Sequence, residues 1–131
     1  MPLTLTPSLK TVLRLDAAMS GAAALLLLVA AGPLSRLLAL PETLLFWAGV
    51  ILVPFVAMLL AVATRKHSPR FLLLDIVLLN SVWTAASFAL LAGGWIAPNL
   101  LGGLFVCVQA IAVAVFAAMQ FAALRSATVA A

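Results

Sequence analysis

Four uninterrupted apolar stretches dominate this sequence, and they lie at residues 7–31, 44–64, 71–92 and 100–124. About 20 apolar residues in a helix span the roughly 30 Å of hydrocarbon in a bilayer. Backbone polar groups inside lipid must bond within their own segment, and none of the stretches alternates with the period of two typical of membrane strands. We therefore predict an all-α fold: a polytopic membrane protein with a four-transmembrane-helix bundle, forming a single transmembrane domain over residues 1–131.

The composition supports the same class. Hydrophobic residues make up 67% of the 131 residues and charged residues 8%. A soluble domain averages about 45–50% apolar and about 25% charged residues. The lipid bilayer is therefore the expected partner. The net charge of +4 does not indicate nucleic acid, because the basic residues lie at the ends of apolar runs rather than together on one polar face.

Prolines mark the expected helix starts. A proline in the first turn costs nothing, because its missing N–H would have no partner there, and the four in question are Pro7, Pro41, Pro69 and Pro98. Thr6 and Asn99 are good N-cap residues for the first and fourth helices. Gly32-Pro33 is expected to end the first helix, which leaves residues 34–40 as a short helix along the outer interface.

Lysines and arginines indicate the orientation, because cytoplasmic loops of membrane proteins are enriched in both. With the N-terminus inside, six of the seven basic residues lie on the inner side: Lys10, Arg14, Arg65, Lys66, Arg70 and Arg125. Only Arg36 lies outside. We expect both termini in the cytoplasm and a multi-pass protein of the bacterial inner (plasma) membrane. A cleaved signal peptide over the first stretch is the alternative, but Asp16 is unusual at that place.

Charged and amide side chains within the apolar stretches are the candidate site residues, because each costs free energy in lipid unless it faces protein, water or a partner. Counting along the helices puts four of them in one layer near the cytoplasmic surface: Arg14, Asp16, Asp75 and Gln120. Arg125 is a candidate fifth member of this layer. Two interpretations stay open. Arg14 or Arg70 neutralises the carboxylates and fixes the packing, or the layer is a protonatable or ligand-binding site.

A second polar layer is expected closer to the middle of the bilayer. Asn80, Thr84 and Ser87 share one face of the third helix, and Trp83 lies beside that face. Gln109 of the fourth helix is expected to meet Asn80 near the centre of the bundle. Interhelical hydrogen bonding is the simpler interpretation, and a polar cleft for a substrate or a lipid headgroup is the other.

Several chemistries lack the residues that they need. Haem ligation by two histidines requires both within the membrane, whereas the one histidine, His67, falls in a loop. A metal site has too few clustered His, Cys and carboxylate ligands, since Cys107 is the one cysteine. A Ser-His-Asp site would have to recruit His67 without a positioned partner. We expect no enzyme, no catalytic residue, no metal and no cofactor.

Two resemblances can be drawn from the residues. Four helices in a short chain with a carboxylate, Asp16, early in the first helix look like the small multidrug resistance transporters, in which an embedded Glu binds protons and cations in turn. Arg14-Leu15-Asp16 in the first helix, Gly32-Pro33-Leu34 after it and Leu40-Pro41 before the second helix resemble the small four-helix membrane proteins of bacteria, DoxX-like proteins among them. This second resemblance covers most of the chain in layout and implies no settled activity.

Two functional classes follow. The first is a non-catalytic accessory or self-associating membrane module, as a homo-oligomer or within a larger membrane complex. The second is a small transporter or binder of an amphipathic or cationic ligand that uses Asp16 and Asp75, with Asn80, Trp83 and Gln109 nearby. An enclosed polar cavity that reaches both acids would favour the second class, and a dry bundle the first.

Overall fold

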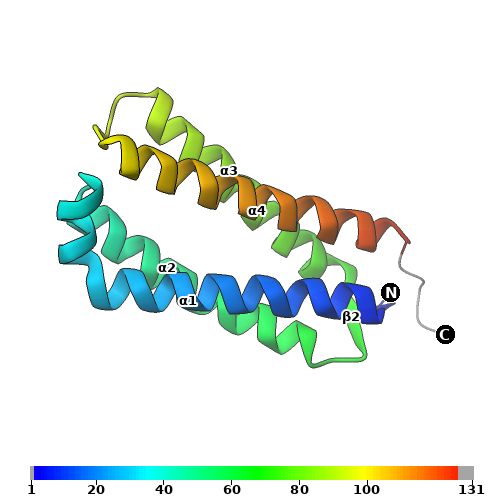
Figure 1. Ribbon diagram of the computed structural model, residues 1–131. Coiled ribbons are helices and arrows are strands. Elements are labelled where there is room, and N and C mark those ends of the chain that lie inside the picture. Colours follow the sequence, from blue (N-terminus) through cyan, green and yellow to red (C-terminus); the bar gives the residue numbers. More distant parts are fainter. Residues whose placement is uncertain (1, 127–131) are drawn as a thin grey trace.

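The computed structural model describes residues 2–126, and it contains the four predicted helices packed as a bundle (Figure 1). The helices are α1 (Pro7–Leu38), α2 (Glu42–Ala63), α3 (Arg70–Ala92) and α4 (Leu100–Ser126), and two short strands are β1 (Pro2–Thr4) and β2 (His67–Pro69). Apart from the C-terminal end of α1, the helix bounds differ from the expected ones by at most two residues. Thr6 caps α1 as predicted, since its Oγ1 accepts a hydrogen bond from the N–H of Leu9 at 3.2 Å.

The bundle consists of two antiparallel hairpins that meet along one seam. Helix α1 packs against α2, α3 packs against α4, and the hairpins join through α1 and α4. Close backbone approach holds the first hairpin: a Cβ on Gly49 of α2 would lie 3.0 Å from the Cβ of Leu27 and 3.3 Å from the carbonyl oxygen of Ala24. A larger residue at position 49 would therefore require the facing atoms of α1 to give way by a few tenths of an ångström.

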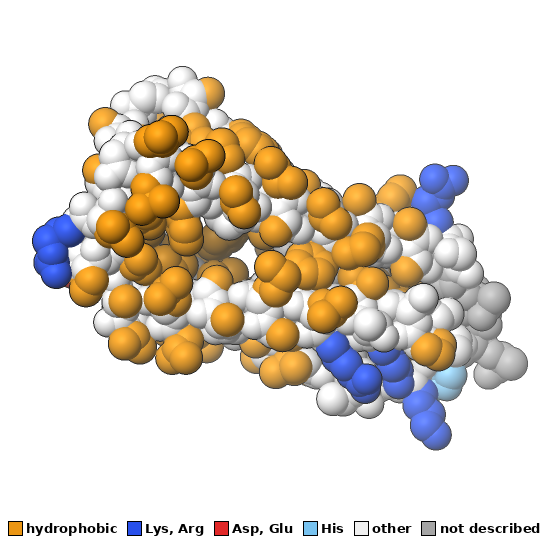
Figure 2. All heavy atoms as spheres, in the orientation of Figure 1, with side chains coloured by type: hydrophobic (Ala, Val, Ile, Leu, Met, Phe, Trp, Pro, Cys, Tyr) orange, Lys and Arg blue, Asp and Glu red, His pale blue; other side chains and the backbone are white. Residues whose placement is uncertain are grey.

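Most of the apolar surface of the helices faces outward. Only 22% to 28% of the most apolar 18-residue window of each helix is buried inside the bundle. Large hydrophobic side chains therefore cover the exterior, as the face in Figure 2 shows. Such a surface is unstable in water and stable against acyl chains. The four helices are long and apolar enough to span a membrane, so the chain is a small multi-pass membrane protein whose exterior contacts lipid.

Helix α1 does not end at Gly32-Pro33, and the separate helix expected over residues 34–40 is its last part. Pro33 has no N–H for the carbonyl of Val29, and its ring crowds that carbonyl, so the helix bends instead of stopping. Ala30 takes up the bend with φ −119° and ψ 25°, and the helix then runs to Leu38. It ends at Ala39, whose left-handed φ of 55° lets the N–H of Leu40 bond to the Ser35 carbonyl at 3.3 Å.

A two-stranded sheet that the sequence did not predict ties the N-terminus to the α2–α3 loop. Strand β1 pairs antiparallel with β2, and Leu3 lies opposite Ser68. Leu3 and Ser68 are both buried, and the N–H of Leu5 bonds to the Lys66 carbonyl at 2.9 Å. Strands of three residues are too short for a hydrophobic period, so tertiary contacts stabilise them rather than local preference. The pairing brings residues 2–4 beside the basic α2–α3 loop.

The buried apolar residues form two clusters, one at each end of the bundle. The first gathers around the start of α1, where Leu9, Leu13, Leu59 and Ile76 are fully buried. The second gathers around the bend of α1 and the start of α2. Four polar side chains of the helices are buried as well, which places the candidate site inside the bundle: Asp16, Asn80, Ser87 and Gln120.

Candidate functional site

A closed ring of hydrogen bonds joins three helices through Asp16 of α1, Asn80 of α3 and Gln120 of α4. The Asn80 amide donates to Asp16 Oδ2 at 2.9 Å and to Gln120 Oε1 at 2.8 Å. The Gln120 amide donates to the same Asp16 oxygen at 2.7 Å. The three side chains are 1%, 3% and 2% exposed, respectively. We call these three residues the polar triad.

Ser20 completes the bonding of the carboxyl group. It lies one turn after Asp16 on α1, and its hydroxyl donates to Asp16 Oδ1 at 2.9 Å. Both hydrogens of the Asn80 amide are used within the triad. Asp16 accepts three hydrogen bonds, from Ser20, Asn80 and Gln120, and all three donors are neutral. In residues 2–126, no buried side-chain nitrogen or oxygen lacks a hydrogen-bond partner.

The depth of the triad follows from the lengths of the helices. Asp16 and Asn80 lie nine and ten residues from the first residues of α1 and α3, and Gln120 lies six residues before the end of α4. At 1.5 Å per residue these separations are about 9–15 Å. The three starting and ending points lie at the same end of the bundle, so the three side chains reach one level inside the apolar core.

Two members of the expected cytoplasmic layer do not join the triad. Asp75 and Arg14 are both exposed, and neither is a bonding partner of Asp16. The buried stripe of α3 contains Leu73, Ile76 and Asn80. Asp75 lies five residues before Asn80, about 140° around the helix, so it faces away from the seam. The single layer expected for the two acids is thus corrected to one buried acid and one peripheral acid.

Arg125 is also separate from the triad. Its guanidinium lies over the ring of Phe121, with 5.8 Å between Cζ and the ring centroid. This is a cation–π contact on the outer surface of α4. The buried carboxyl group of Asp16 is therefore held by amide and hydroxyl dipoles and not by any of the arginines that sequence reasoning considered for it.

The second polar layer lies within the α3–α4 hairpin. The indole N–H of Trp83 donates to Gln109 Oε1 at 2.8 Å, and the Gln109 amide donates to Ser87 Oγ at 3.0 Å. Thr84 Oγ1 donates to the Ala110 carbonyl at 3.3 Å. These bonds connect α3 and α4, and the Gln109 side chain bonds within this hairpin.

The expected pair of Asn80 and Gln109 does not form. In the antiparallel α3–α4 hairpin, Gln109 lies level with Trp83 and Ser87. Asn80 lies closer to the start of α3 than Trp83 does. Because the two helices are antiparallel, the residue of α4 at the level of Asn80 lies nearer the C-terminal end of α4, and it is Gln120. The helix faces of these side chains could be predicted from the sequence, whereas the register of the two helices could not, because packing determines it.

Ser20 is the one partner of the triad that sequence reasoning did not include among the site residues. Its position four residues after Asp16 was the available signal, because side chains at i and i+4 lie on the same helix face. For metal binding, the described part of the chain holds no group of three or more His, Cys, Asp or Glu side chains that could hold an ion. Cys107 is half-buried with a free thiol.

Comparison with known proteins gives no further assignment. No protein-family model matches the chain, and neither the curated proteins nor the solved structures contain a match. The fold and the triad therefore carry what can be stated: this is a small four-helix membrane protein with a buried, neutral-donor hydrogen-bond network around one carboxyl group.

Proposed function

We propose that this protein is a non-catalytic membrane module, acting as an accessory subunit or through self-association. The observation that carries the proposal is the closed bonding of the polar triad. Asp16 accepts three hydrogen bonds from its own chain, and both amides of the triad are bonded to its other members. Groups that are already satisfied in a dry core stabilise helix packing and offer little to a substrate.

The alternative function is transport or binding of an amphipathic or cationic ligand. Its support is Asp16 itself, because a buried acid within a membrane span is a common element of ion and proton pathways. Against it stand two observations. Asp75, the second acid of this proposal, is exposed on another face of α3, and two hollows of the bundle, one between α1 and α2 and one between α3 and α4, are lined by residues outside the triad.

A dye-transport assay separates the two functions. We expect inside-out vesicles that contain the protein to move the cation ethidium, under an imposed proton gradient, at the rate of vesicles without it. The double variant Asp16→Asn, Asp75→Asn is expected to behave in the same way, with Asp75→Asn alone as the matched control. Proton-coupled dye uptake by the wild-type protein that the double variant loses would establish the transport function and overturn the proposal.

The proposal includes an orientation with both termini in the cytoplasm of a bacterial inner membrane. Helix α1 begins and α4 ends at the same end of the bundle (Figure 1). Figure 2 shows several Lys and Arg side chains at that end, and Arg36 lies in the last turn of α1 at the other end. This asymmetry supports the orientation, because basic residues are retained on the cytoplasmic side.

Cysteine labelling in intact cells tests the orientation. In a Cys107→Ser background, Trp95→Cys is expected to react with a membrane-impermeant maleimide added from outside, because the α3–α4 turn lies at the outer end. His67→Cys, in the exposed α2–α3 loop, is the matched control and is expected to react only after the cells are opened. The reverse pattern would place both termini outside.

A further inference from the structure

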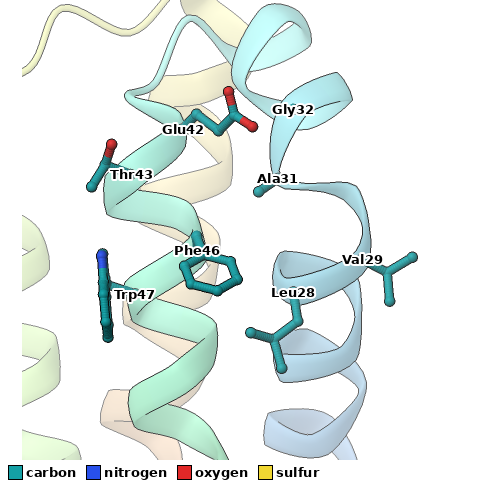
Figure 3. Close-up of a pocket in the computed structure, with 8 residues that line it drawn as sticks. All are labelled: Leu28, Val29, Ala31, Gly32, Glu42, Thr43, Phe46 and Trp47. Carbon is teal, nitrogen blue, oxygen red and sulfur yellow. The ribbon is translucent and has the colours of Figure 1, made fainter.

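A hollow of about 410 Å³ lies between the bend of α1 and the start of α2 (Figure 3). The polar triad lies nearer the other end of the bundle. Its walls include Leu28 and Gly32 from α1 and Glu42, Thr43, Phe46 and Trp47 from α2. The bend at Ala30 changes the direction of α1 just below Gly32. The volume falls within the range of about 300–1,000 Å³ that is typical of sites for small molecules.

Opposite charges converge at the upper edge of this hollow. Figure 3 shows the Glu42 side chain directed toward Gly32. A Cβ on Gly32 would lie 3.4 Å from Glu42 Oε1 and 3.9 Å from Arg36 Nη1. A carboxylate and a guanidinium thus flank one point that glycine leaves open, and both side chains are exposed. A ligand at this point meets a negative and a positive group a few ångströms apart.

Below the charges the hollow is apolar and open toward lipid. Phe46 follows Glu42 by one turn, which places it about 6 Å deeper along α2. The rings of Phe46 and Trp47 pack edge to face, with centroids 5.6 Å apart. Trp47 is 56% exposed and Val29 is 76% exposed, so the apolar walls meet acyl chains. Polarity therefore falls from the charged edge to the apolar floor, as it does along a phospholipid.

We propose that this hollow binds a bilayer phospholipid with a zwitterionic headgroup that carries a primary ammonium. The ammonium donates to the Glu42 carboxylate, the phosphate accepts from Arg36, and the glycerol region and upper acyl chain lie against Phe46 and Trp47. Glu42 distinguishes headgroups, because a primary ammonium donates hydrogen bonds and a quaternary one does not. Arg36 contributes to the binding of any phospholipid, since its partner is the shared phosphate.

Native mass spectrometry of the purified full-length chain tests the site. The protein is released from micelles that contain equal amounts of phosphatidylethanolamine and phosphatidylcholine, and the bound lipids are counted. We expect the wild-type protein to retain phosphatidylethanolamine about three- to tenfold over phosphatidylcholine, which corresponds to a charged hydrogen bond at a partly exposed site. Glu42→Gln is expected to remove this preference, and Arg36→Gln to lower the retention of both lipids.

Asp75→Asn is the matched control, because it removes an exposed acid at the other end of the bundle and is expected to keep the wild-type preference. A preference that Glu42→Gln leaves unchanged, or that Asp75→Asn lowers equally, would overturn the proposal. Glycerophosphoethanolamine, the same headgroup without acyl chains, is expected to displace no bound lipid at equal concentration. Displacement by this soluble compound would contradict a bilayer lipid as the occupant.

Discussion

Gly102→Ala is expected to lower the free energy of unfolding by about 3 kcal/mol, which is a large overpacking effect. A Cβ at this position would overlap the carbonyl oxygen of Leu38 and lie 3.0 Å from the Leu38 carbonyl carbon. These atoms belong to the backbone of α1, so no side-chain rotation relieves the contact. The start of α4 would have to move away from the end of α1.

That movement would also break the hydrogen bonds that hold the two helix ends together. The N–H of Asn99 donates to the Leu38 carbonyl at 3.3 Å, and its side-chain amide donates to the Leu37 carbonyl at 2.8 Å. Asn99 caps α4 at the same time, as the sequence predicted, through its Oδ1 and the N–H of Gly102 at 2.8 Å. The junction therefore combines a cap, two interhelical hydrogen bonds and a close backbone contact.

Gly103→Ala is the matched control for this prediction, and it is expected to have the opposite sign. No atom lies within 4 Å of a Cβ placed there, so the substitution adds no contact and gains about 0.5–1 kcal/mol of helix preference. Equilibrium unfolding by SDS in mixed micelles, followed by circular dichroism, measures both variants. Equal stabilities for the two variants would show that the α1–α4 junction does not depend on the close contact at Gly102.

The four membrane helices could be predicted from the sequence because lipid permits few backbone structures and fixes the helix length. The end of α1 could not. Gly32-Pro33 has the local features of a helix stop, yet the structure needs only one non-helical residue, Ala30, to pass it. What continues the helix is tertiary: Leu38 is buried, and its carbonyl accepts the bond from Asn99. No pattern in the local sequence predicts this bond between Asn99 and Leu38.

The depth of the candidate site in the bundle could be predicted from the sequence, but its hydrogen-bond partners could not. Residue counts along the helices place Asp16 and Gln120 at a common level, since each residue adds a fixed rise. The bonding of Asn80 depends on the register between α3 and α4 and on the choice of α1 as the neighbour of α4. These are properties of side-chain packing over three helices. The exposed position of Asp75 could have been predicted, because Asp75 lies off the helix face that contains Asn80 and Ser87.

Asn80→Ala is expected to lower the free energy of unfolding by about 2–3 kcal/mol. Interhelical hydrogen bonds in membranes contribute about 0.6 kcal/mol on average, so the two lost bonds account for only about half of this. The rest comes from leaving the buried Asp16 carboxyl and the Gln120 carbonyl short of a donor, which costs about 1–3 kcal/mol. Ser81→Ala is the matched control, because Ser81 is exposed and its hydroxyl bonds only to the Val77 carbonyl of its own helix.

The order of the triad variants tests which side chain organises the network. Asp16→Asn keeps an oxygen in the place of Oδ2 that accepts from both Asn80 and Gln120, and it puts an amide nitrogen in the place of Oδ1 beside Ser20, so its expected cost of about 1 kcal/mol is smaller than that of Asn80→Ala. Steric trapping in bicelles measures both against Ser81→Ala, for which a change below about 0.5 kcal/mol is expected. A larger loss for Asp16→Asn than for Asn80→Ala would mean that the Asp16 carboxyl group, rather than the two-donor amide of Asn80, holds α1, α3 and α4 together.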